Sequence, residues 1–250
     1  MLHASLLLLT GLALQTPAQT EPAAINPEVT HEVAPEIRCD IMVARKLYRE
    51  AVECFKAGAG TSAVMANKAG IVYHQLGTAA DIENARKYYE KAIKLNPKYA
   101  EAINNLGTVY YSRKSYRRAI SEYRKALALR PDFAPFLANL GTAFFARKQY
   151  QQATASYLQA LRSDPDVFER RSTQGTSIQD QTVQERAKYH YYVAKTYAQA
   201  GESDRAIQYI RKALEEGFKD RNRFLKEPEF AVLRENPEFK EIMAAEQKVL

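Results

Sequence analysis

Few residues in this chain of 250 amino acids have the types and spacing that chemistry requires. Its four histidines and two cysteines form no H-E-x-x-H or C-x-x-C pattern. His74 and His190 have no flanking cluster of ligands, so packing or surface roles suit them better than a metal site. G-x-S-x-G and Walker motifs are absent, and Gly58 to Ser62 has no lysine after its second glycine. We therefore expect no catalytic residue, metal, cofactor or small-molecule substrate.

The two cysteines, Cys39 and Cys54, would be oxidisable after export from the cytosol. If one helix ran through both, a rise of about 1.5 Å per residue would place them about 22 Å apart. A disulfide requires Cα atoms within about 7 Å, so a bridge would require the helix to start after Cys39. The spacing favours two free thiols and leaves the bridge open as the alternative.

Basic side chains concentrate in one short stretch. The whole chain has a formal net charge of +7, and residues 113–130 alone have a net charge of +6. A solvated helix face is the simplest interpretation, and the functional one is a patch for an acidic partner or phospholipid headgroups. No recognisable nucleic-acid-binding fold accompanies it, so we expect no nucleic acid partner. The candidate basic patch comprises Arg113, Lys114, Arg117, Arg118, Arg124, Lys125 and Arg130.

A repeat supplies the elements that position these residues. Residues 100–133, laid over 134–167 without a gap, give 14 identities in 34 positions. Pro97, Pro131 and Pro165 stand at successive steps of 34. Apolar residues within each unit recur at steps of three and four, which is typical of amphipathic helices. Each unit therefore predicts two helices, the second of which ends before a proline.

The residues shared by the two units resemble the tetratricopeptide repeat (TPR) family. The resemblance implies an all-α fold, a right-handed superhelix of antiparallel helix pairs, here with a C-terminal helical cap. Gly107 and Gly141 would stand where the first helix of a pair approaches the second. The second unit carries the pattern as Leu106, Gly107, Tyr110, Ala119, Tyr123 and Pro131.

The remaining chain divides around these units. We expect a lone helix or a half repeat from Ile41 to Lys56 that covers the first unit. That unit has 37 residues, with an extra segment, Thr78 to Ala80, in its turn. Prolines disfavour a helix in the leader, whereas Pro228 and Pro237 would each start a helix of the cap. The expected organisation is a signal peptide at 1–18, a disordered leader at 19–36, an N-terminal capping helix within 37–62, units at 63–99, 100–133, 134–167 and 187–220, an insertion at 168–186, and a C-terminal helical cap at 221–250.

The N-terminal residues have the features of an export signal. The apolar run from Leu6 to Leu14 is too short to span about 30 Å of hydrocarbon, but it suits a signal peptide. Thr16 and Ala18 are small residues at a spacing that signal peptidase accepts. We therefore expect an exported protein, periplasmic or secreted.

The TPR resemblance also implies a binding surface, because the first helices of such superhelices line a concave groove for extended or helical peptides. Asn105 and Asn139, one repeat apart, resemble the asparagine ladders of TPR proteins and would track a peptide backbone. Alternatively, these asparagines serve contacts between helices. The candidate peptide-binding groove comprises Asn67, Ile71, His74, Asn105, Thr108, Tyr111, Asn139, Thr142, Phe145, Tyr192 and Lys195.

Together these observations predict a non-catalytic adaptor or assembly factor of the bacterial envelope that binds a protein or peptide in the groove. The alternative is a protein that binds a membrane surface or an anionic envelope polymer through the basic patch. Salt would separate the two, because screening weakens the binding of exposed charges far more than apolar binding.

Overall fold

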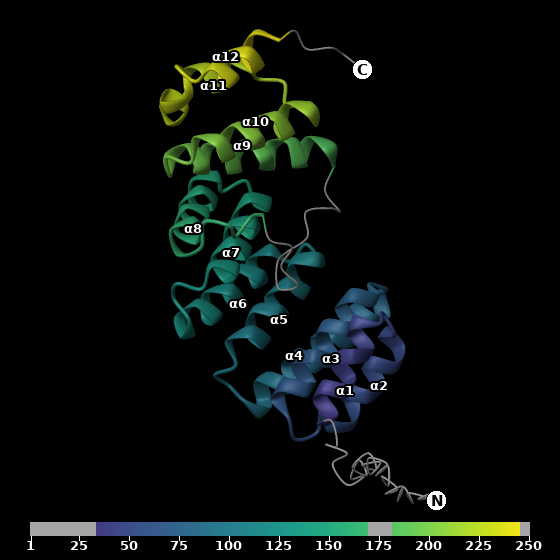
Figure 1. Cartoon of the computed structure of the whole chain (residues 1–250). Coiled ribbons are helices and arrows are strands. Elements are labelled where there is room, and N and C mark those ends of the chain that lie inside the picture. Colours follow the sequence, from purple (N-terminus) through teal and green to yellow (C-terminus); the bar gives the residue numbers. More distant parts are fainter. Residues whose placement is uncertain (1–33, 170–181, 246–250) are drawn as a thin grey trace, which may run out of the picture. The chain divides into compact units, whose positions relative to one another are not determined.

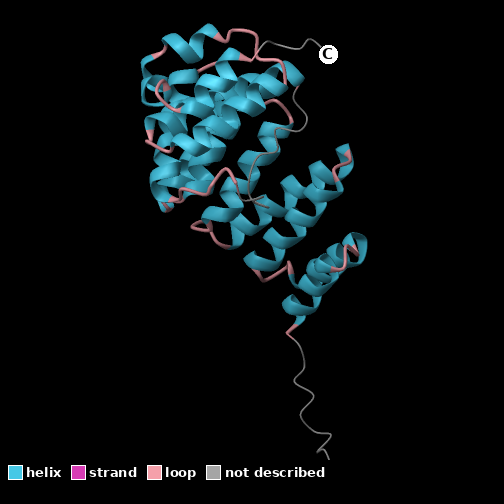
Figure 2. Cartoon of the chain, turned by 45° about the horizontal axis from the view of Figure 1, so that its top comes forward, coloured by secondary structure: helices cyan, strands magenta, loops and turns pink. Residues whose placement is uncertain are grey.

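The computed structural model describes residues 34–169 and 182–245, and the regular elements within them are helices (Figure 1, Figure 2). The expected signal peptide at 1–18, residues 19–33 of the expected leader and residues 170–181 of the expected insertion lie outside the described ranges.

Successive helices form pairs that pack along their lengths. Each second helix also packs on the first helix of the next pair, so every pair buries its apolar faces against its neighbours. The pairs are α1 (Pro35–Ala44) with α2 (Tyr48–Gly58), α3 (Ala63–Leu76) with α4 (Ala79–Leu95), α5 (Ala100–Ser112) with α6 (Tyr116–Leu129), α7 (Ala134–Ala146) with α8 (Tyr150–Ser163), and α9 (Val183–Gln199) with α10 (Ser203–Glu215).

The turns inside three of these pairs share one sequence and one conformation. Each reads Arg-Lys-x-Tyr, and Lys46, Lys114 and Lys148 have φ angles of 61°, 57° and 62°. In each turn the lysine N–H donates to the carbonyl three residues back, and the next N–H donates to the carbonyl five residues back. These bonds satisfy the last carbonyls of the first helix and reverse the chain.

The first of these turns corrects the expectation of a lone helix or a half repeat from Ile41 to Lys56. The chain folds back at residues 45–47, so the N-terminal region is a complete helix pair. Helix α1 also begins at Pro35, within the expected disordered leader at 19–36. A proline in the first turn lacks only an N–H that would have no partner inside the helix, so Pro35 starts α1 instead of preventing it.

The same turn brings Cys39 and Cys54 together in a disulfide, with Cα atoms 5.5 Å apart. The prediction of two free thiols is therefore wrong, because it assumed one continuous helix. The bridge also forms without the late helix start that we expected it to require. Counted back from its turn, Cys39 occupies the position that Gly107 and Gly141 occupy in their own pairs.

Gly107 and Gly141 do mark the places where paired helices come closest. A Cβ atom added at Gly107 would lie 2.7 Å from Cε1 of Tyr123, and one at Gly141 would lie 2.5 Å from Cδ1 of Tyr157. Both rings are fully buried. The expected close approach of first and second helix is confirmed in these two pairs.

Two helix starts differ from the expected boundaries. The Thr78 hydroxyl accepts a bond of 3.1 Å from the Asp81 N–H, so Ala79 and Ala80 extend α4 instead of lengthening the turn. Helix α9 starts at Val183, ahead of the expected start of the unit at 187, because Thr182 and Glu185 form a capping box.

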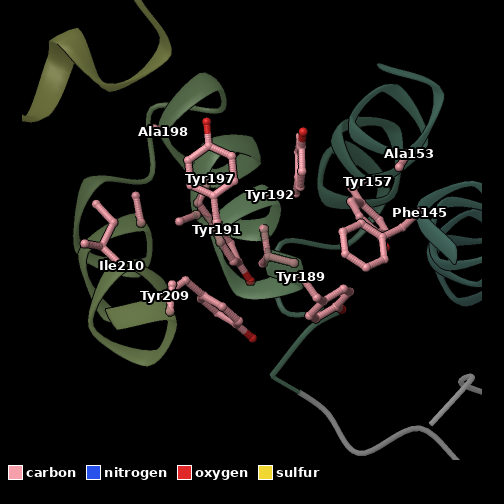
Figure 3. Packing of buried hydrophobic residues seen from close by; sticks show 14 of the residues in the cluster. Phe145, Ala153, Tyr157, Tyr189, Tyr191, Tyr192, Tyr197, Ala198, Tyr209 and Ile210 are labelled. Carbon is pink, nitrogen blue, oxygen red and sulfur yellow. The ribbon is translucent and has the colours of Figure 1, made fainter. Parts of the chain in front are cut away.

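Aromatic side chains dominate the core of the C-terminal half (Figure 3). The cap consists of α11 (Asn222–Lys226), the 3₁₀ helix η1 (Pro228–Leu233) and α12 (Pro237–Ala244). Phe224, Phe230, Leu233 and Phe239 of the cap are buried in the same cluster as α9 and α10. The cap thereby covers apolar surface that would otherwise face water at the end of the stack.

Candidate functional site

The first helices of successive pairs lie side by side. Helix α5 contacts both α3 and α7 directly. Lys68 on α3 reaches α1, with its Nζ 2.6 Å from Glu36 Oε1 and 2.6 Å from Asp40 Oδ2. Rings of α7 and α9 also meet, with the centroids of Phe145 and Tyr192 5.9 Å apart. We call the side of the stack on which these first helices adjoin the inner face.

A chain of asparagine side chains links the first helices. Asn139 on α7 donates to Asn104 on α5 (Nδ2 to Oδ1, 3.0 Å), and Asn104 donates to Asn105 (3.3 Å). Asn105 donates to Asn67 on α3 (3.0 Å), and Asn67 donates to the Tyr99 hydroxyl (3.4 Å). The four asparagines are buried, so these bonds satisfy amides that would otherwise lose their hydrogen bonds to water.

This arrangement supports the alternative role of the predicted asparagines. Asn67, Asn105 and Asn139 come together as expected, but they bond between helices instead of facing solvent along a groove. Asn104, the link between α5 and α7, is absent from the predicted set. The third unit has Ala138 at the equivalent position, so comparison of the repeats gave no signal for it. The neighbouring pair Asn104-Asn105 was the sequence feature that could have indicated it.

The predicted threonines also bond inside the protein. The Tyr123 hydroxyl lies 3.3 Å from Thr108 Oγ1, and the Tyr157 hydroxyl lies 3.3 Å from Thr142 Oγ1. Each threonine donates in turn to the carbonyl four residues back. The buried second-helix tyrosine therefore finds a partner on the first helix of the same pair, which is the usual requirement for a buried hydroxyl.

The aromatic members of the predicted groove are almost completely buried. Tyr111, Phe145 and Tyr192 expose only 5–8% of their surface. Tyr192 stacks on Tyr150 with ring centroids 4.6 Å apart. Phe145 meets Tyr189 edge-on, with ring centroids 5.8 Å apart (Figure 3). These rings hold α7, α8 and α9 together. Packing between helices therefore explains their spacing in the sequence as well as ligand binding would.

The other predicted groove members are half-buried. Ile71 and His74 lie on α3, and burial lowers the pKa of His74. Lys195 on α9 contacts the cap, with Nζ 2.9 Å from Glu227 Oε2 and 3.1 Å from Glu229 Oε1. Burial alone would lower the pKa of Lys195, but its bonds to these carboxylates raise it overall. The more exposed side chains of the first helices are ones that the sequence did not single out, including Gln75, Ser112 and Gln199.

The predicted basic patch divides into paired and unpaired cations. Arg113 Nη2 lies 2.6 Å from Glu83 Oε2, Lys125 Nζ lies 2.8 Å from Glu122 Oε1, and Arg130 pairs with Glu101. Bonds from Arg86 and Arg113 lower the pKa of Glu83 to about 2. Across residues 34–169 and 182–245, Lys114, Arg117, Arg118 and Arg124 have no carboxylate partner.

The unpaired cations line two adjoining hollows between α6 and the end of α7. One hollow, of about 460 Å³, runs from Lys114 to Arg118, and the other, of about 490 Å³, runs along α6 from Arg117 to Ala128. Arg117 and Arg147 line both, so the hollows adjoin. Arg147 belongs to the next pair and lay outside the predicted patch, because a linear charge count ended at Arg130. We call these two hollows the basic cleft.

The described residues contain no candidate metal site and no helix that could span a membrane. No group of three or more histidine, cysteine, aspartate or glutamate side chains in that part of the chain could hold a metal ion. Within the same residues, each helix is too short or too polar to cross a membrane.

Comparison with known proteins gives one consistent result. Family models described as tetratricopeptide repeat match residues 74–132, 105–168 and 187–216. A crystal structure of MamA shares 20% identity over 72% of this chain and 95% of that chain, with a TM-score of 0.50. MamA 41-end from Desulfovibrio magneticus RS-1 shares 20% identity over 74% of this chain and 94% of that chain, also with a TM-score of 0.50.

A third similar structure is the APC/C hetero-tetramer Cut9–Hcn1, which shares 19% identity over 73% of this chain and 32% of that chain, with a TM-score of 0.50. At sequence identities this low, the similarity shows a shared fold and nothing more. Among curated proteins, none matches the chain by sequence.

Proposed function

Because the chain belongs to the tetratricopeptide repeat family, we propose that it is a non-catalytic adaptor that holds a segment of another protein along its inner face. The continuous row of first helices is the observation that carries this proposal. Stacked repeats present extended surfaces of this kind to their partners.

The bonding of the inner face supports the proposal through rigidity. The asparagine chain and the Lys68 ion pairs fix the spacing of α1, α3, α5 and α7. A surface whose spacing is already fixed loses less conformational entropy when a ligand binds. The half-buried Ile71 and the exposed Gln75, one helical turn apart on α3, offer one apolar and one polar contact.

We also propose that the protein is exported and works in the bacterial envelope or outside the cell. The Cys39–Cys54 disulfide supports this localisation, because disulfides persist in oxidising compartments and are rare in the cytosol. Intact mass and fractionation of the protein from its own host would test it. We expect a chain that has lost residues 1–18 in the envelope or the medium. A chain that keeps Met1 and stays in the cytosolic fraction would contradict the localisation.

Site-specific photocrosslinking tests the adaptor role. A photoreactive amino acid replaces Gln75, which follows the inner-face residue Asn67 by about two helical turns on α3, or, as a matched control, the exposed Gln151 on α8, a second helix. In cells that express the full chain, we expect a discrete crosslinked protein from position 75 and none from position 151. Equal crosslinking from both positions, or none from position 75, would refute the inner face as the binding surface.

A further inference from the structure

The basic cleft concentrates cations, most of which have no compensating charge. Lys114, Arg117, Arg118, Arg124, Lys125 and Arg147 line it, and none of the residues that line either hollow is acidic. Glu122 also lies on α6, but it pairs with Lys125 and exposes only 14% of its side chain. Like charges that are held together without counter-charges repel one another. An anionic ligand would remove this repulsion.

Aromatic rings hold two of these guanidinium groups in place. Arg118 lies over the ring of Tyr110, with its Cζ 5.8 Å from the centroid, and Arg124 lies over the ring of Phe144 at 5.5 Å. Contacts of this kind orient the planar guanidinium and leave its N–H groups free to donate. A guanidinium donates to a carboxylate through two parallel bonds, which adds directional selectivity to the charge attraction.

The lining of the cleft is partly apolar. Tyr116 forms part of one hollow, and Ile120 and Ala128 form part of the other. Arg117 and Arg124 stand two turns apart on α6, about 10 Å along the helix axis. The cleft is thus longer than a single anion, and it offers apolar contact between its cations.

We propose that the basic cleft binds an acidic peptide segment, one in which carboxylates alternate with apolar side chains. Its carboxylates would pair with the arginines, and its apolar side chains would cover the accessible parts of Tyr116 and Ala128. The proposal adds a second docking surface to the adaptor. The cleft lies on α6 and the turns beside it, so it does not depend on the inner face.

The mixed basic and apolar lining of the cleft favours a peptide over a headgroup or a free anion. A lipid headgroup would engage the arginines but would leave the apolar side chains of the lining uncovered. A free phosphate would likewise engage the arginines alone. A short extended peptide can match both the cations and the apolar side chains of the lining, with electrostatic attraction speeding its association and apolar contact slowing its release.

Fluorescence anisotropy on the full chain tests the proposal. The probe is a short labelled peptide of alternating Glu, Phe, Asp and Leu, and its neutral twin carries Gln and Asn in place of the acids. Vesicles of phosphatidylglycerol and phosphatidylcholine are the membrane probe. The cleft variant is Arg117→Gln/Arg147→Gln. The charge-matched control is Arg38→Gln/Arg45→Gln, two exposed arginines on α1 and its turn.

We expect the acidic peptide, and not its neutral twin, to bind wild type and the control variant. The cleft variant should bind it about tenfold or more weakly, since it loses two charge-assisted contacts. Equal weakening by both variants would mean general attraction to a basic protein and would overturn the proposal. So would failure of the acidic peptide to bind wild type, or binding of the vesicles in its place. Crosslinking from position 75 in the cleft variant tests the adaptor role separately. This crosslink should persist even if the proposal about the basic cleft fails.

Discussion

The asparagines of the first helices donate to one another in a single direction, from Asn139 through Asn104 and Asn105 to Asn67. Each bond lies in a buried environment, where an amide without a partner is costly. At the scale of single residues, the chain therefore uses asparagine to join repeats. A polar link of this kind sets the register of neighbouring helices more sharply than apolar contact alone.

The middle link gives the most direct test of this role. Asn104→Ala removes the acceptor of the Asn139 amide and the donor to Asn105, so we expect the free energy of unfolding to fall by about 1–3 kcal/mol. Asn84→Ala on α4 is the matched control, and we expect it to change stability little. Urea denaturation measures both variants. Equal losses in the two would mean that the asparagine chain does not stabilise the stack.

The contact of Gly141 with the ring of Tyr157 predicts a second effect. Gly141→Ala would place a Cβ 2.5 Å from that buried ring and 3.2 Å from the Ala153 carbonyl oxygen. We expect a loss of about 1–3 kcal/mol, which is typical of overpacking. Gly60→Ala serves as the control, because a Cβ there has no neighbour within 4 Å among the described residues. A Gly141→Ala variant as stable as wild type in thermal denaturation would contradict the close approach.

Histidine burial predicts how stability depends on pH. Burial lowers the pKa of His74 and, against the opposing charge of Glu216, also that of His190 below the usual 6.5. Both histidines therefore take up protons at a higher pH in the unfolded chain than in the folded one. Their contribution to the free energy of unfolding is fully present above pH 6.5 and is lost as the pH falls below it. We expect the variant His74→Gln/His190→Gln to show a flatter fall of unfolding free energy than wild type. An unchanged slope in urea titrations would argue against this origin.

At the scale of elements, the N-terminal helix pair shows what sequence patterns miss. Arg45-Lys46-Leu47-Tyr48 has the same form as Arg113-Lys114-Ser115-Tyr116, and all three Arg-Lys-x-Tyr turns share one left-handed lysine. No glycine or proline marks the break, and Cys39 replaces the glycine by which a repeat is recognised. The Arg-Lys-x-Tyr sequence indicated a turn here, but the helical spacing of apolar residues continues through it and predicts a single helix.

The disulfide gives this pair a testable dependence on redox state. A bridge across about 15 residues contributes about 3 kcal/mol by restricting the unfolded chain. We expect Cys39→Ser/Cys54→Ser to lower the Tm of the N-terminal pair and to abolish the sensitivity of wild type to reductant. Alkylation without reductant should add nothing to the intact mass of wild type. Two adducts would show free thiols and would contradict the bridge.

At the scale of the whole molecule, the repeat made most of the fold predictable. Pro131, Gly107 and Tyr123 fix where the helices of a unit end and cross, because their backbone and volume requirements are strict. The candidate site was less predictable, since the same first-helix positions serve either a ligand or the next helix. Asn105 bonds to Asn67 of the preceding pair, which only the folded stack brings near. Arg147 likewise joins the basic cleft from the following pair.

The central claim is that the inner face binds a partner protein. The most direct measurement is the affinity of the partner recovered by crosslinking at position 75, purified and titrated against wild type, Gln75→Arg and Gln151→Arg. Both substitutions add the same charge and volume to exposed side chains, one on α3 and one on α8. The account predicts that Gln75→Arg weakens binding about tenfold or more, whereas Gln151→Arg leaves it unchanged. Equal affinity of the two variants would contradict it.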